Sequence, residues 1–156
     1  MGSRLVVVCG LPGAGKTTRA EQVAGVIGAV RLSPDDWMRG LGIDLFDQPA
    51  RSRIEALQWE LAQELLALGT NVVVEWGFWT RAERDVRRDG ARRLGAAVEL
   101  HFLHEPVDVL WARVSARGRE EAWGSRAITR EELEEWAAAF EAPDAAELAL
   151  YDAPSR

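Results

Sequence analysis

The stretch Gly10-Leu11-Pro12-Gly13-Ala14-Gly15-Lys16-Thr17 fits the phosphate-binding pattern G-x-x-x-x-G-K-[ST] and decides the predicted fold. An apolar run from Leu5 to Cys9 precedes the motif and predicts a buried strand, and residues 18–27 after it have the pattern of a helix. The motif therefore lies at a strand-to-helix turn, the context that it requires. In that context the loop N–H groups and the positive end of the helix dipole form a site for a polyphosphate.

Each position of this loop has an expected role. The glycines let the backbone approach the phosphates closely. We expect Lys16 to reach the β- and γ-phosphates of ATP and the Thr17 hydroxyl to ligate Mg²⁺. Lys16 is the one lysine among 19 basic residues, which suggests that a compact ammonium is needed there. The predicted nucleotide-binding residues of this segment are Gly10, Leu11, Pro12, Gly13, Ala14, Gly15, Lys16, Thr17 and Thr18.

Composition limits the class of protein. A chain of 156 residues with 47% hydrophobic and 28% charged residues is typical of one globular domain, which we expect to span residues 1–156. No apolar run approaches the roughly 20 residues of a membrane helix, and the N-terminal residues do not resemble a signal peptide, so we predict a cytoplasmic protein without a membrane partner. The single cysteine excludes an internal disulfide. A net charge of −6 disfavours nucleic acid as a partner, although a local basic groove is compatible with it. Oligomeric state is not indicated.

Strands and helices alternate along the rest of the chain. Short apolar strands are predicted at 29–33, 71–75 and 97–103, and residues 147–151 are a candidate for a further strand. The strand at 71–75 is apolar without alternation, which predicts a central position beside the strand that starts at Leu5. The fold class is therefore α/β, a three-layer P-loop NTPase or kinase fold with a central parallel sheet of four or five strands. In such a sheet, ligands bind at the carboxyl ends of the strands.

Helix starts are marked by local signals. Thr80 with Glu83, and Thr129 with Glu132, fit the capping box in which a Ser or Thr side chain and an acid three residues later exchange hydrogen bonds with the backbone. Ser33 followed by proline also fits a helix start. These signals predict helices that begin near residues 34, 81 and 130.

Acidic residues follow two of the predicted strands. Asp35 and Asp36 come after the second strand and Glu75 ends the third. A carboxylate beside the γ-phosphate can accept a proton from an attacking hydroxyl, or it can hold Mg²⁺ through a water molecule. We interpret Asp35 as a general base that contacts the acceptor, and Glu75 as part of the metal shell with Thr17. Asp36 fits better as an acid that stabilises a helix start.

Three tryptophans also emerge near strand ends, at positions 37, 76 and 79. A flat ring at that edge can stack on a base or another planar substrate, so Trp37, Trp76 and Trp79 are candidates for substrate binding. Packing within the core is the alternative for each of them.

Four segments together carry a resemblance to a known family: Gly10 to Thr18, Ser33 to Arg39, Glu75 to Trp79, and the arginine-bearing segment after the fourth strand. They resemble the small P-loop kinases of the AAA_33 group, which is similar to polynucleotide 5′-kinases, chloramphenicol phosphotransferase and zeta toxins. The resemblance implies that Asp35 is the general base, and that Arg39 holds a substrate phosphate as in polynucleotide kinases. Glu75 stands where the family usually has aspartate, so the resemblance does not extend to direct contact between this residue and the metal.

The resemblance further implies a mobile lid whose arginines grip ATP, here drawn from Arg113, Arg117, Arg119 and Arg126. The segment at about 118–128 is polar and flanked by glycines, and Arg113 and Arg117 lie four residues apart on one helix face, which independently favours a lid. We expect Arg113 and Arg117 to bind the nucleotide, and Arg117 and Arg126 to act in catalysis. The alternative is that these arginines only solubilise a loop.

The leading hypothesis is an ATP- and Mg²⁺-dependent phosphotransferase that acts on a hydroxyl of a small molecule such as a nucleoside, sugar or antibiotic. One alternative is a polynucleotide 5′-hydroxyl kinase, which a basic groove leading to Asp35 would favour. A second is an ATP-binding switch module without transfer activity, which burial of Asp35 in an ion pair away from any opening would favour.

Overall fold

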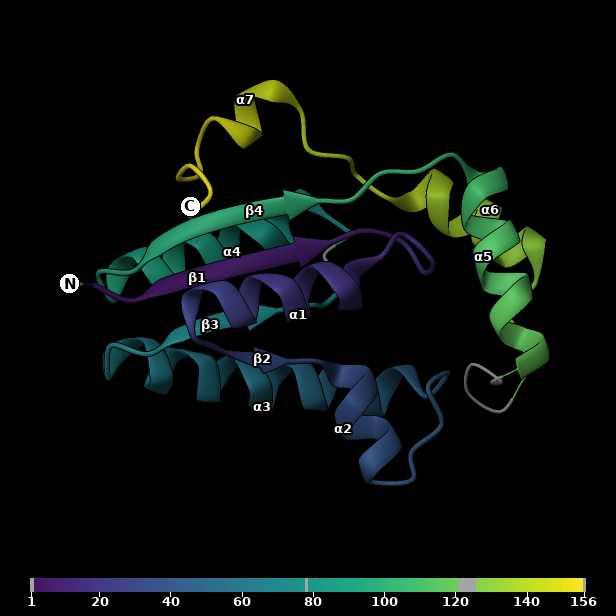
Figure 1. Cartoon of the computed structure of the whole chain (residues 1–156), viewed down its shortest axis with the longest axis horizontal. Coiled ribbons are helices and arrows are strands. Elements are labelled where there is room, and N and C mark those ends of the chain that lie inside the picture. Colours follow the sequence, from purple (N-terminus) through teal and green to yellow (C-terminus); the bar gives the residue numbers. More distant parts are fainter. Residues whose placement is uncertain (1, 78, 121–125, 156) are drawn as a thin grey trace.

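Four parallel strands form the central sheet, in the order β2-β3-β1-β4 (Figure 1). The computed structural model describes residues 2–77, 79–120 and 126–155. The elements in chain order are β1 (Arg4–Cys9), α1 (Lys16–Ile27), β2 (Ala29–Leu32), α2 (Pro34–Gly40), α3 (Gln48–Ala67), β3 (Asn71–Val74), α4 (Arg81–Arg93), β4 (Ala97–Phe102), α5 (Val107–Glu120), α6 (Arg130–Ala139) and α7 (Ala145–Leu148).

The two interior strands are β1 and β3. They pair in parallel with Leu5 opposite Val72 and Val7 opposite Val74, and Leu5, Val7, Val72 and Val74 are fully buried. Strands with apolar side chains on both faces need cover on both faces, so their place in the middle of the sheet follows from their sequence. The predicted parallel α/β fold and the neighbouring positions of these two strands are confirmed.

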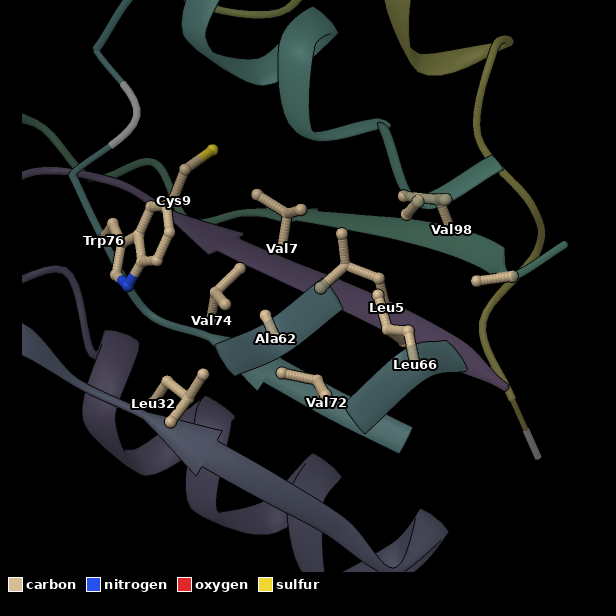
Figure 2. Close-up of a cluster of buried hydrophobic side chains, with 12 residues drawn as sticks. Leu5, Val7, Cys9, Leu32, Ala62, Leu66, Val72, Val74, Trp76 and Val98 are labelled. Carbon is tan, nitrogen blue, oxygen red and sulfur yellow. The ribbon is translucent and has the colours of Figure 1, made fainter. Parts of the chain in front are cut away.

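Helices cover both faces of the sheet and make three layers. On one face, a cluster of buried residues joins the strands to Ala62 and Leu66 of α3 (Figure 2). The cluster also includes Ala91 of α4. On the other face, Val6 and Val8 of β1 pack against α1. The carboxyl ends of the strands point toward α2, α5 and α6, so these three helices lie at the edge where a ligand would bind (Figure 1).

Side-chain caps fix several helix starts as predicted. The Ser33 hydroxyl accepts a hydrogen bond from the Asp36 N–H at the start of α2. Complete capping boxes with Thr80 and Thr129 start α4 and α6. The three predicted starts are therefore confirmed.

The candidate strand at 147–151 does not form, and the sheet has four strands. The chain forms a short helix there, α7, because the Asp144 carboxylate caps it by accepting a hydrogen bond of 2.7 Å from the Glu147 N–H. The following residues still lie against β4: the Asp152 N–H donates to the Val98 carbonyl oxygen at 2.8 Å, and an Asp152 carboxylate oxygen accepts from the Val98 N–H at 2.7 Å.

A buried ion pair between Arg84 of α4 and Glu147 holds α7 against the rest of the fold. The Arg84 side chain is fully buried, and its Nε and Nη2 donate to the two Glu147 carboxylate oxygens at 2.6 and 3.0 Å. Arg84 Nη2 also donates to the Glu141 carbonyl oxygen at 2.7 Å. Turning Glu147 inward therefore gives the buried guanidinium its anion and anchors the C-terminal segment on α4.

We predict that Arg84→Met destabilises the protein by about 3–5 kcal/mol, because it leaves the Glu147 carboxylate buried without a counter-charge. Urea unfolding of the variant and the wild type measures this loss. The double variant Arg84→Met/Glu147→Gln should recover most of it, since no buried charge then lacks a partner. A loss of less than about 1 kcal/mol in the single variant, as for a surface pair, contradicts this account.

Candidate active site

The phosphate loop leads into helix α1, whose N-terminus begins with glycine in place of a capping side chain. Gly15 occupies the cap position of α1 with φ 95°, and the described residues supply neither a side-chain cap nor an acid in the first turn. Five other helices, α2, α3, α4, α6 and α7, begin with a Ser, Thr or Asp cap. The first N–H groups of α1 are therefore available to donate hydrogen bonds to another acceptor, which makes this helix end suited to an anion.

Two glycines of the loop are required by close packing. A Cβ on Gly10 would lie 2.7 Å from the Leu103 carbonyl oxygen, and one on Gly13 would lie 3.0 Å from a Val114 methyl carbon of α5. The Arg113 side chain, also on α5, donates from Nη1 to the Gly13 carbonyl oxygen at 3.0 Å. Of the arginines expected to bind the nucleotide, Arg113 thus lies directly against the phosphate loop.

Lys16 is held inside this loop. Its Nζ donates to the carbonyl oxygens of Gly10 and Leu11 at 2.9 and 3.2 Å. Burial lowers the pKa of Lys16 to about 8, while the negative charges of Asp35 and Glu75 act in the opposite direction. The charges of both predicted acids therefore act on this ammonium group, as expected for side chains placed where β1, β2 and β3 end.

Glu75 lies just after β3 and is buried. Burial raises the pKa of its carboxyl group, and the Arg31 guanidinium and hydrogen bonds with the Thr17 and Ser33 hydroxyls oppose that rise. The structure thus brings together Thr17 and Glu75, the two residues predicted to form the metal shell. A hydroxyl and a carboxylate are oxygen ligands of the kind that Mg²⁺ takes beside substrate phosphates, so these residues fit that ion.

Asp35 forms an ion pair that the sequence did not indicate. Arg51 of α3 places Nη1 2.7 Å from Asp35 Oδ1, and its Nη2 donates to the Leu45 carbonyl oxygen at 3.1 Å. The Asp35 side chain nevertheless keeps 35% of its surface exposed, so it is paired but open to solvent.

Arg31 is a second site residue that sequence analysis missed. It lies on β2, and its guanidinium donates to Glu75 Oε1 and to Asp36 Oδ2. Glu75 is 44 residues away in sequence, so the one available signal was an arginine inside a short strand that leads to the Ser33 cap. Arg39 follows Asp36 on α2, with Nη1 4.0 Å from Asp36 Oδ1, and its side chain is exposed.

The three candidate tryptophans occupy different surroundings. Trp76 is buried in the core (Figure 2). Its Nε1 donates to Gln58 Oε1 at 2.9 Å. Trp37 is half-buried between two apolar clusters, and Trp79 packs against Trp136 with ring centroids 5.8 Å apart. Core packing, the alternative left open for each ring, describes Trp76 in this structure.

The predicted lid is only partly described. Residues 121–125 and the Arg119 side chain lie outside the described residues. Arg117 is exposed near the end of α5. Arg126 donates to both Glu132 carboxylate oxygens, at 2.9 and 2.5 Å, and its guanidinium carbon lies 4.0 Å from the centroid of the Phe46 ring, which belongs to the connection between α2 and α3. The end of this segment therefore contacts the α2–α3 connection.

A parallel sheet with a phosphate loop between β1 and α1, and with acids at the ends of the next two strands, defines a P-loop NTPase of the kinase-like type. The AAA_33 family model, described as an AAA domain, matches residues 5–143. The chain therefore belongs to this family.

Solved structures support the same fold. The chain is similar to a putative kinase from Chloroflexus aurantiacus, with 22% identity and a TM-score of 0.74 over 92% of this chain and 83% of that one. A sugar kinase from Janibacter sp. is 26% identical, with a TM-score of 0.65 over 93% and 82% of the two chains. A chain of the Pnkp1/Rnl/Hen1 RNA repair complex is 20% identical, with a TM-score of 0.75. The match covers 88% of the present chain but only 44% of the longer chain from that complex.

No curated protein matches the sequence. Among the described residues, no helix combines the length and apolarity that crossing a bilayer requires.

We predict that Thr17→Val removes the Mg²⁺ enhancement of nucleotide binding, because valine keeps the shape of threonine but lacks the oxygen ligand. Titration calorimetry with a non-hydrolysable ATP analogue at several Mg²⁺ concentrations should show the apparent metal affinity lowered by about 10- to 100-fold or more. Affinity without Mg²⁺ should be unchanged. Thr18→Val is the matched control and should keep the wild-type Mg²⁺ dependence; equal behaviour of the two variants would contradict the metal role of Thr17.

Proposed function

We propose that this protein is an ATP- and Mg²⁺-dependent phosphotransferase that moves the γ-phosphate to a hydroxyl of a small molecule, such as a nucleoside, a sugar or an antibiotic. The observation that carries the proposal is the placement of Lys16, Asp35 and Glu75 at one edge of the sheet, just beyond the ends of β1, β2 and β3, with the charges of both acids acting on the Lys16 ammonium. A phosphoryl-transfer site needs these three charges in one place.

The proposed mechanism divides the work among these side chains. Lys16 leaves its loop carbonyl partners and holds the β- and γ-phosphates, while the α1 N–H groups bind the phosphate oxygens. Asp35 accepts the proton of the acceptor hydroxyl as that oxygen attacks phosphorus. Mg²⁺, when bound, neutralises charge on the phosphates. Thr17 is proposed as its ligand, and Glu75, already paired with Arg31, suits a role through a metal-bound water better than direct coordination.

Arginines complete the proposed site. Arg113 lies against the phosphate loop and is proposed to bind the nucleotide together with Arg117. Arg126 is proposed to act on the transferring phosphate after release from Glu132. Arg39 is exposed on the same short helix as Asp35 and is proposed, with Trp37 and Trp79, to contact the acceptor.

The partly exposed Asp35 bears on the alternatives. A switch module without transfer activity needs no accessible base, whereas 35% of the Asp35 side chain is open despite its ion pair with Arg51. This exposure favours transfer. A polynucleotide 5′-hydroxyl kinase remains the second candidate, because exposed Arg39 beside Asp35 suits an acceptor that carries a phosphate.

Incubation with γ-labelled ATP and three separate pools tests the proposal: oligonucleotides, nucleosides with sugars, and natural-product antibiotics. Label in either small-molecule pool supports the proposed function, and label confined to oligonucleotides favours the polynucleotide kinase. Tight ATP binding with no label in any pool favours the switch. Lys16→Ala serves as the inactive control.

We predict that substitutions of Lys16 and of Asp35 affect nucleotide binding and phosphoryl transfer differently. Lys16→Ala should lose nucleotide affinity and turnover together, because the ammonium contacts phosphate charge both before and during transfer. Asp35→Asn should keep ATP binding and lower transfer by roughly 10² to 10⁴, because the amide keeps the shape but cannot take the proton. Nucleotide titration and initial-rate assays on the labelled acceptor measure the two effects.

Asp36→Asn is the neighbouring control for this pair and should lower transfer much less than Asp35→Asn does. If Asp36→Asn lost transfer while Asp35→Asn kept it, Asp36 and not Asp35 would be the general base. Normal transfer in both variants would contradict the general-base mechanism.

A further inference from the structure

Four side chains of alternating charge connect the end of β3 to the short helix α2. The Arg31 guanidinium donates from Nη1 to Glu75 Oε1 and from Nη2 to Asp36 Oδ2, and Asp36 Oδ1 lies 4.0 Å from Arg39 Nη1. One planar group thus bonds two carboxylates that belong to different elements. Each charge in the series is followed by one of opposite sign.

This series runs from the interior to the surface. The exposed fractions of the side chains are 3% for Glu75, 21% for Arg31, 47% for Asp36 and 58% for Arg39. Its inner end shares hydrogen bonds with Thr17 of the phosphate loop. Its outer end lies on the helix that also carries Asp35. The contacts therefore link the nucleotide side of the site to the acceptor side.

Helix α2 depends on such contacts because it is short. It has seven residues, and its start is held by the Ser33 cap, whose hydrogen bond from the Asp36 N–H is long at 3.4 Å. Met38 anchors the opposite side of the helix in an apolar cluster. The bond from Arg31 to Asp36 is a direct charged link between α2 and the sheet, and it fixes the turn that bears Asp35.

The chemistry of the link requires arginine. A guanidinium presents separate N–H groups in a rigid plane and can bond two carboxylates at once, whereas an ammonium is a single point of charge. A third carboxylate, Glu21 of α1, lies 3.9 Å from Arg31 Nη2, but it belongs to neither end of the series.

We propose that Arg31 is a positioning residue that couples nucleotide binding to the orientation of α2. Charge that enters beside Thr17 and Glu75 changes how strongly Glu75 holds the guanidinium, and the same guanidinium holds Asp36. The setting of α2 therefore responds to the nucleotide through Arg31. The coupling itself requires only nucleotide binding, and it rests on the proposed function where the positioned residue, Asp35, is taken as the base.

Hydrogen exchange of residues 34–40, measured by mass spectrometry with and without AMP-PNP and Mg²⁺, tests the coupling. In the wild type, saturating nucleotide should change exchange in this segment by about five-fold or more, the lower end of typical coupling between sites. Asp36→Ala cuts the exposed end of the link without disturbing buried Glu75, and it should lose this response. Because coupling is reciprocal, its nucleotide affinity should change only by a similar factor of about five, so it still binds nucleotide. Glu21→Ala is the matched control, since it removes the third carboxylate near Arg31, and it should respond as the wild type does.

A second variant tests the fork itself and keeps the buried charge paired. Arg31→Lys should still bind nucleotide, with an affinity changed by no more than about the same five-fold factor, and should also lose the response of residues 34–40. A wild-type response retained in both Asp36→Ala and Arg31→Lys would overturn the coupling. Unchanged hydrogen exchange of residues 34–40 in the wild type at saturating nucleotide would overturn it as well. The exchange measurement contains no acceptor, so it does not depend on transfer activity. If the coupling is observed but the labelling assay shows no transfer to any acceptor, only the proposed function is overturned. A protein that binds no nucleotide would overturn both.

Discussion

Parallel pairing of β1 with β3 is the constraint on which the rest of the structure depends. Val7 lies opposite Val74, the last residue of β3, and β1 continues to Cys9, so the phosphate loop and Glu75 leave the sheet at the same edge. The valines and leucines of both strands are fully buried, and burial of each such side chain contributes roughly 1.5–3 kcal/mol. The same apolar pairing that stabilises the core therefore sets Thr17 beside Glu75.

Charge balance is the second constraint at this edge. Glu75 is buried and Lys16 is half-buried, and a charge withdrawn from water is costly when isolated, so each charge needs a partner. Among the described residues, Glu75 pairs with Arg31, Asp35 with Arg51, and Glu132 with Arg126, while Lys16 bonds loop carbonyl oxygens. A polyphosphate brings several negative charges to this region. Its arrival would compete with the carboxylates for the cations, which is why ion pairing in this structure does not exclude these arginines from the nucleotide site.

The sequence predicted the parts whose signals are local or periodic. The phosphate loop, the continuous apolar strands and the capping boxes of Thr80 and Thr129 each contain their physical cause within a few residues. Partnerships across the fold were not accessible. Arg84 lies among several arginines of α4 and resembles a solvated residue until Glu147, 63 residues later, supplies its anion.

The same limit applies to the candidate site. The sequence indicated Lys16, Asp35 and Glu75 by their positions at strand ends, and the structure brings them together. It did not indicate Arg31 or Arg51, because an arginine in a short strand or at a helix start has no distinctive pattern. Trp76 followed a strand as a surface candidate would, but Gln58 provides its indole N–H with a buried partner.

The Asp35–Arg51 ion pair decides how a charged, partnered carboxylate can still serve as a base. Arg51 is itself held, because its second nitrogen donates to the Leu45 carbonyl oxygen, so the guanidinium is fixed on α3. The 2.7 Å contact with Arg51 is at Oδ1, an oxygen that is itself buried, so the exposed part of the Asp35 side chain lies on its other atoms. A carboxylate has about four lone-pair sites on two oxygens, so a contact at Oδ1 orients the group and leaves lone pairs on the other oxygen for a hydroxyl. A side chain that is one-third exposed, with its paired oxygen buried, is the arrangement expected of an oriented base. It differs from the Glu147 carboxylate, which is 2% exposed and accepts from Arg84 at both oxygens.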